Sequence, residues 1–155
     1  MRSLRFKVKK KDLKGLKKKV ADIAQQRYKL DVGIVDNISY PNGTSVAYVA
    51  YLNEYGHGRN PQRPFMHRTF TNYYAEAMEG FQANLKGITN APSTNVRRAF
   101  TLTGMYLKDR MKRTILTWPV DDPRRNKYPH KNGDYRPLID TQLMLNSINY
   151  KVTKR

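Results

Sequence analysis

The feature that most constrains the fold is a long amphipathic repeat in the second half of the chain. Apolar or small side chains recur at three- and four-residue steps over residues 96–115, which is the spacing of one face of an α-helix. Trp118-Pro119 ends this pattern. A second apolar and aromatic pattern runs from Phe65 to about Gly87, and Pro92 separates the two. The sequence therefore predicts two long consecutive helices.

Short runs of apolar side chains predict strands towards both ends of the chain. Apolar and cationic side chains alternate over residues 4–8, residues 30–35 form an apolar run, and residues 149–153 continue from the last helix. A basic amphipathic helix over residues 12–28 separates the first two strands. We expect one α+β domain over residues 1–155, in which a small mixed or antiparallel β-sheet packs against several α-helices.

Residues 46–65 predict a corner made of a helix, a loop and the start of the next helix. The first ten of these residues are compatible with a helix or a strand, but their alanine spacing favours a helix that Gly56 ends. Arg63 lies between two prolines, where it is suited to a fixed salt bridge with a carboxylate such as that of Glu54. Phe65 can anchor the following helix in the core.

The C-terminal region combines a long loop with a short helix. Residues 119–137 have no periodicity and several prolines, which is typical of an extended loop with a functional role. Asp140 is placed to cap a short helix that runs through Leu143 and Leu145 towards Ile148.

The net charge of +18 is concentrated in two segments. Residues 1–29 carry twelve Lys or Arg and two Asp, and residues 97–136 carry eleven Lys or Arg and four Asp. The segment between them is nearly neutral. Such blocks attract anionic partners, either nucleic acid or an acidic protein.

Composition excludes several classes of protein. The chain has no cysteine, which removes disulfides, thiolate zinc sites and cysteine nucleophiles and fits synthesis in a reducing cytoplasm. No window approaches the roughly 18 apolar residues of a membrane span, so we expect no membrane partner. The basic N-terminus lacks the apolar core of an export signal.

No arrangement of residues predicts catalysis. The histidines His57 and His67 do not have the spacing of a zinc site, and no phosphate loop or nucleophile elbow is present. A nuclease-like metal site around His130 and Asp134 can be considered, but carboxylates in an Arg-rich loop more often neutralise nearby cations. We therefore expect no enzymatic activity, no catalytic residues, no metal and no cofactor.

The cationic segments allow sequence-independent contacts with phosphates. No DNA- or RNA-binding motif accompanies them. The expected contacts with a partner or with DNA are Lys9, Lys10, Lys11, Lys17, Lys18, Arg97, Arg98, Arg110, Arg113, Arg124, Arg125 and Lys127.

Two separated segments resemble one known protein family. The first consists of an alanine-containing helix, then Asn53, Glu54, Tyr55 and Gly56, a loop, and then Arg63, Pro64 and Phe65. The second has Pro137, an apolar pair, and then Asp140, Thr141, Leu143, Ser147 and Ile148 before a strand. This order resembles the tail-completion or neck (head-tail joining) proteins of tailed bacteriophages, a type of minor tail protein. The resemblance spans residues 30–152, and one departure is Gln142, where the family usually has Gly.

The resemblance implies a structural virion protein. Members of the family form a ring, commonly of six copies, between the head connector and the tail terminator or tail tube, with DNA passing through the ring. It implies a location in the neck or tail of the virion after synthesis in the bacterial host cytoplasm. Residues 119–137 and the basic N-terminal arm are then the expected contacts between subunits or rings. The alternative is a sequence-nonspecific nucleic-acid-binding protein whose resemblance to the family is accidental or limited to the fold.

Overall fold

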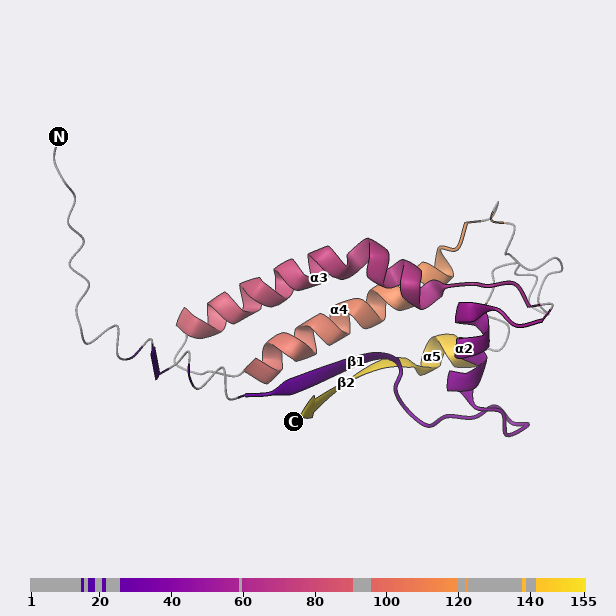
Figure 1. Cartoon of the computed structure of the whole chain (residues 1–155), viewed down its shortest axis with the longest axis horizontal. Coiled ribbons are helices and arrows are strands. Elements are labelled where there is room, and N and C mark those ends of the chain that lie inside the picture. The colour runs from indigo at the N-terminus through magenta and orange to yellow at the C-terminus, as the bar shows by residue number, and fades with distance from the viewer. Residues whose placement is uncertain are drawn as a thin grey trace.

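The protein is a small α+β structure in which two strands from opposite ends of the chain pair beneath a layer of helices (Figure 1). The computed structural model describes residues 15, 17–18, 21, 26–58, 60–90, 96–119, 122, 138 and 142–155. Its elements in chain order are β1 (Tyr28–Ile34), α2 (Val46–Tyr55), α3 (Phe65–Asn90), α4 (Val96–Leu116), α5 (Leu143–Ser147) and β2 (Ile148–Lys154). This arrangement confirms the expected fold class.

The sheet in the described residues consists of β1 and β2, paired antiparallel from Tyr28 opposite Lys154 to Ile34 opposite Ile148. Successive side chains of a strand point to opposite faces. Leu30, Val32 and Ile34 therefore share one face, while Lys29 and Asp31 lie on the other. The alternation gives the sheet one apolar face and one charged face.

Helix α4 covers the apolar face, and α3 lies on the far side of α4 (Figure 1). The three layers meet at Phe100 of α4. Its ring centroid lies 5.8 Å from that of Tyr28 in β1 and 5.0 Å from that of Phe81 in α3. The apolar stripe predicted for residues 96–115 is thus the contact between α4 and its neighbours.

The sheet approaches α4 most closely at Gly104. A methyl group in place of the Gly104 hydrogen would lie 2.5 Å from Cδ2 of Tyr150 and 2.9 Å from Cδ1 of Leu30. Both distances are shorter than any normal carbon–carbon contact. Glycine is required here because one residue from each strand, Leu30 of β1 and Tyr150 of β2, packs directly onto the helix backbone.

The main hydrophobic core lies at the end of the molecule where α2 and α5 meet the ends of the long helices (Figure 1). Its buried members come from residues far apart in the sequence. They are Val46, Ala50, Phe65, Met111, Ile115, Trp118, Met144, Leu145 and Ile148.

Several element boundaries differ from those expected. The helix expected to reach Tyr28 ends earlier, because Gln26 and Arg27 are not helical and Tyr28 already pairs with β2. Helix α3 continues to Asn90, three residues beyond Gly87. Helix α4 ends at Leu116, two residues before Trp118.

The short C-terminal helix also begins later than expected. The residue at its N-cap is Gln142 rather than Asp140, and Gln142 makes no side-chain capping hydrogen bond. Ile148 starts β2 instead of ending the helix. The expected strand at residues 4–8 lies outside the described residues, as does the loop over residues 119–137 except for Pro119 and Asp122.

Candidate functional site

The corner between α2 and α3 contains most of the residues on which the family resemblance rests. Helix α2 ends at Gly56, which has a φ of 75°. A Cβ at this position would lie 3.1 Å from the backbone nitrogen of Gln62 and 3.3 Å from the carbonyl oxygen of Asn60. Glycine therefore provides both the left-handed backbone and the space through which the loop folds back.

Glu54 joins α2 to the beginning of α3. Its side chain is buried, and its two carboxylate oxygens accept hydrogen bonds from the backbone N–H groups of Met66 at 2.9 Å and His67 at 2.8 Å. The first N–H groups of a helix have no partner within the helix and carry partial positive charge. Glu54 thus caps α3 from another helix, and α3 has no acidic residue in its own first turn.

Arg63 organises the loop through the side chains of two asparagines. Its Nη1 donates hydrogen bonds to Oδ1 of Asn60 at 2.7 Å and to Oδ1 of Asn53 at 3.3 Å. The backbone N–H of Arg63 also donates to the carbonyl oxygen of Asn53 at 2.6 Å. Burial lowers the pKa of the Arg63 guanidinium, which nevertheless stays charged at neutral pH.

The expected salt bridge between Arg63 and Glu54 is absent from the ion pairs within the described part of the chain. Glu54 as the partner was wrong, because both of its carboxylate oxygens accept hydrogen bonds from backbone N–H groups at the start of α3. Asn60, which the sequence did not single out, instead contacts Arg63. Asparagine is common in loops, so the sequence alone could not identify Asn60 as the hydrogen-bond partner of Arg63.

The second motif segment packs against the first. Phe65 is fully buried and belongs to the same core as Met144, Leu145 and Ile148 of the C-terminal segment. The hydroxyl of the buried Ser147 donates a 2.7 Å hydrogen bond to the carbonyl oxygen of Leu143. Asp140 and Thr141 lie outside the described residues.

Gln142 has a left-handed backbone, with φ 56° and ψ −3°. This conformation is unfavourable for residues with a Cβ and is readily adopted by glycine. The position at which the resembled family usually has Gly is therefore one where the backbone favours Gly. Gln142 adopts this left-handed backbone although it carries a Cβ.

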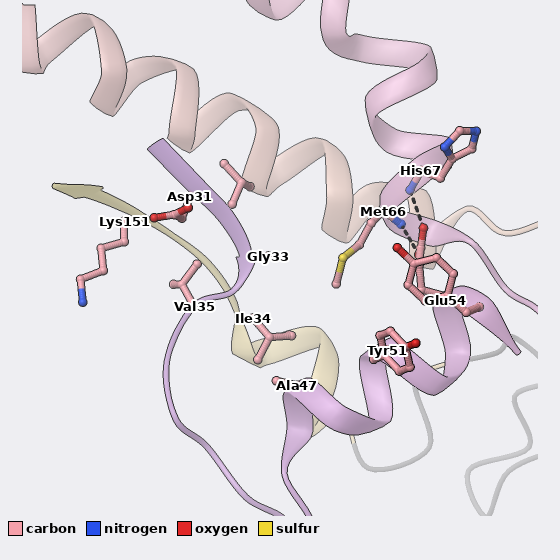
Figure 2. Close-up of a pocket in the computed structure, with 12 residues that line it drawn as sticks. Asp31, Gly33, Ile34, Val35, Ala47, Tyr51, Glu54, Met66, His67 and Lys151 are labelled. Atoms are coloured by element: carbon pink, nitrogen blue, oxygen red, sulfur yellow. Dashed lines mark hydrogen bonds between the residues drawn. The ribbon is translucent and has the colours of Figure 1, made fainter. Parts of the chain in front are cut away.

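A groove of about 800 Å³ opens beside the corner, between β1, α2 and the start of α3 (Figure 2). One wall is formed by residues 31–35, which are the end of β1 and the residue after it. Figure 2 shows Met66 pointing into the space between this wall and α2, with Ala47 and Tyr51 on the opposite side. The lining of the groove therefore mixes apolar side chains with polar and charged ones. The Glu54 carboxylate lies at one end, where the α3 backbone N–H groups bind it.

Helix α2 presents a tyrosine surface to solvent next to this groove. Tyr48, Tyr51 and Tyr55 are each more than half exposed, at 55%, 58% and 64%. The rings of Tyr51 and Tyr55 contact one another, with centroids 4.8 Å apart. Exposed tyrosines of this kind are enriched at protein–protein interfaces, since they combine a large apolar area with a polar tip.

The described cationic residues do not form one cluster. Lys17, Lys18, Arg97, Arg98 and Arg113 are exposed. Arg97 and Arg113 lie about 24 Å apart along the axis of α4, at a rise of 1.5 Å per residue. The remaining expected contacts, Lys9, Lys10, Lys11, Arg124, Arg125 and Lys127, lie outside the described residues.

Arg110 has an internal role that the sequence did not indicate. Its guanidinium lies 4.8 Å from the ring centroid of Tyr106 and 5.2 Å from that of Tyr73, and it forms a 3.8 Å ion pair with Glu76. Its interaction with the Tyr106 hydroxyl raises the pKa of Arg110. These contacts connect α4 to α3, so the residue is engaged within the protein.

Two further structural results concern metal ions and membranes. Among the described residues, no group of three or more His, Asp or Glu side chains is arranged to hold a metal ion. In the same part of the chain, neither long helix has a stretch apolar enough to cross a membrane.

Comparisons of the chain with protein-family models, with curated proteins and with solved structures find no match.

Proposed function

We propose that this chain is a non-enzymatic structural protein that assembles with copies of itself. More specifically, we propose that it is a neck protein of a tailed bacteriophage, which forms a ring, with six copies as the expected number, between the head connector and the tail. In this role its partners are the connector and the tail terminator or tail tube, and DNA passes through the ring. Its location would be the neck of the virion.

The observation that carries the proposal is the packing of the two resembling segments against each other. They are separated by about 75 residues in the sequence, yet Phe65 of the first and Met144, Leu145 and Ile148 of the second share one core. Two short resemblances to one family are stronger support for that family's fold when the two segments pack together than when they lie apart. The left-handed backbone at Gln142 adds support, because it accounts for the glycine that the family usually has there.

The mechanism that we propose is assembly rather than chemistry. Ring closure requires heterologous contacts, in which one surface of a subunit binds a different surface of the next. The tyrosine surface of α2 (Tyr48, Tyr51 and Tyr55) and the adjoining groove offer one such surface. The capped and hydrogen-bonded corner holds this surface rigid, which reduces the entropy lost when subunits associate.

The direct test is electron microscopy of particles produced without this protein. A neck role predicts DNA-filled heads and separate tails, which join when the purified protein is added. A Tyr51→Ser, Tyr55→Ser double variant should fold normally but fail to join them, whereas Tyr74→Ser, an equally exposed tyrosine on α3, should behave as the unmodified protein. Intact, infectious tailed virions in the absence of the protein would refute the proposal.

Sequence-nonspecific binding to nucleic acid is the second candidate function, and the high positive charge supports it. Its test is the affinity of the purified chain for duplex DNA as salt increases, which should fall with a slope of about −0.9 for each phosphate contact. Replacing the exposed Arg97 and Arg98 with Gln should reduce that slope by about two. A neck protein should instead bind DNA weakly on its own and bind connector or tail proteins tightly.

A further inference from the structure

The outer edge of β1 has backbone groups without a partner strand. In an antiparallel pair, alternate residues direct their N–H and C=O groups towards the partner strand. The hydrogen bond from the Arg155 N–H to the Arg27 carbonyl, 2.9 Å long, fixes this alternation. With the observed register, residues 29, 31 and 33 bond to β2, and Leu30, Val32 and Ile34 direct their N–H and C=O groups outwards. No third strand among the described residues pairs with them.

The groove adjoins this outer edge. Its lining includes residues 31–35 and Lys151 of β2, and its apolar part is formed by Val32, Ile34, Met66 and Ala47. Figure 2 shows Met66, Ala47 and Tyr51 to one side of the end of β1, and Lys151 of β2 to the other. An added strand would therefore find backbone partners on β1 and an apolar surface for the side chains that lie on the same face as Val32. This combination is typical of sites that bind a peptide by adding a strand to a sheet.

Exposed strand edges are normally protected against such addition. Proteins use proline, bulges, inward-pointing charges or a covering element for this purpose. Residues 31–35, the end of β1 and the residue after it, contain no proline, and their one charged side chain, Asp31, points to the charged face and pairs with Lys29 at 2.6 Å. In the part of the chain that the structure describes, the edge beside the groove is thus open to a strand.

A segment of this same chain has the required pattern. Residues 4–8 alternate Leu4, Phe6 and Val8 with cationic side chains, which predicts a strand with one apolar face. In the added position, the apolar residues would face Met66 and α2, and the cations would lie beside Asp31 on the charged face. About 18 residues link this segment to β1. The helix expected within this linker would be about 20 Å long, at 1.5 Å per residue.

The structure favours a strand donated to β1 by another copy of the chain over a strand from the same chain. A strand that returned beside its own β1 in parallel would need a crossover helix packed on a face of the sheet. Helix α4 already covers the apolar face, and the other face carries Lys29, Asp31 and Lys151. That charged face offers no apolar contact to the predicted basic helix, whose described residues Lys17 and Lys18 are exposed.

We propose that the outer edge of β1 and the groove beside it bind residues 4–8 of a second copy of this chain as a third strand. The choice of a second copy as donor rests on the ring assembly proposed above. Each subunit would give its N-terminal strand to one neighbour and receive a strand from the other. Such an exchange is heterologous, and it is the type of contact that can close into a ring.

Disulfide cross-linking tests this contact in the full-length protein, which has no cysteine of its own. Donor chains carry Arg5→Cys, Lys7→Cys or Lys9→Cys, so that any register is sampled. Acceptor chains carry Asp31→Cys on β1 or, as the matched control, Lys151→Cys opposite it on β2. An added strand would lie about 4.8 Å from β1 and about 9.6 Å from β2, and a disulfide requires Cα atoms within about 7 Å.

The proposal predicts that at least one donor forms a mixed disulfide with the Asp31→Cys chain at least tenfold more than with the Lys151→Cys chain. The linked peptides are identified by mass spectrometry after mild oxidation. Adding Phe6→Asp to that donor should abolish the product, while Arg2→Gln, outside the strand, should not. Equal yields, a preference for Lys151→Cys or no product from any donor would overturn the proposal.

A chain that carries both the successful donor cysteine and Asp31→Cys shows whether the added strand comes from a second copy or from the same chain. A second-copy donor gives disulfide-linked oligomers, and an intramolecular disulfide in the monomer would overturn the exchange. The result is independent of the particle experiment. Heads and tails that fail to join without the protein, combined with absent cross-links, would refute only the strand exchange. Cross-links combined with complete virions in its absence would refute only the neck role.

Discussion

The close contact at Gly104 allows a sharp test of how α4 and the sheet pack. Replacement of a helical Gly with Ala normally stabilises a helix by about 1 kcal/mol. At position 104 the new methyl carbon would lie 2.5 and 2.8 Å from two ring carbons of Tyr150 and 2.9 Å from Leu30. One of the ring carbons, Cγ, lies on the axis about which the ring turns, so rotation of the Tyr150 ring about χ2 cannot relieve the contact.

The expected net effect is destabilisation. Overpacking of this kind costs about 1–3 kcal/mol, and three contacts under 3.0 Å place Gly104→Ala at the upper end of that range. After the gain in helix propensity, the loss is about 2 kcal/mol. For a chain of this size, that loss lowers Tm by about 4–8 °C.

Gly80→Ala provides the matched control. Gly80 lies inside α3, and nothing comes within 4 Å of the position of its Cβ. This variant should be more stable by about 1 kcal/mol. The measurement is thermal unfolding followed by circular dichroism, with chemical unfolding of the same samples. Equal stabilisation by both substitutions would refute the close packing of the sheet on α4.

Three further predictions concern individual side chains. Glu54→Ala should lower the free energy of unfolding by about 2–4 kcal/mol in urea titrations, because two N–H groups of α3 lose a charged acceptor; Glu54→Gln, which retains one acceptor oxygen, should lose less, and equal losses would contradict the double cap. Gln142→Gly should raise the unfolding free energy by about 0.5–1 kcal/mol, since the left-handed backbone costs a residue with a Cβ about 1–2 kcal/mol and glycine returns part of that as chain entropy; a loss of stability would show that the Gln side chain has a contact of its own. Arg110→Met should lower Tm, whereas Arg113→Met on the exposed side of the same helix should leave it nearly unchanged; the opposite order in thermal melts would contradict the internal role of Arg110.

Elements with strong local signals were predicted well from the sequence. The helix over Val46–Tyr55 and its end at Gly56 are both confirmed. So are the strands near residues 30–35 and 149–153 and the buried stripe of α4. Periodicity and turn residues determine these features because they depend on neighbours within a few positions.

Side-chain partners in the corner were predicted less well. The sequence marked Glu54 and Arg63 as opposite charges with suitable spacing, and the fold instead gives Glu54 to the backbone of α3 and Arg63 to asparagines. The start of the last helix was misplaced for a similar reason. Asp140 matches the composition of an N-cap, but the backbone at Gln142 sets where the helix begins.

The sequence by itself determined the types of element, the α+β class and the separation of charge into two segments, because these follow from local pattern and composition. Only the tertiary structure decided which distant residues meet. It brought the two resembling segments into one core and required glycine at position 104. Among the described residues, it also left the outer edge of β1 without a partner strand, beside a groove. These features arise when strands from opposite ends of the chain pair and helices pack on them, and such long-range contacts leave no local period in the sequence.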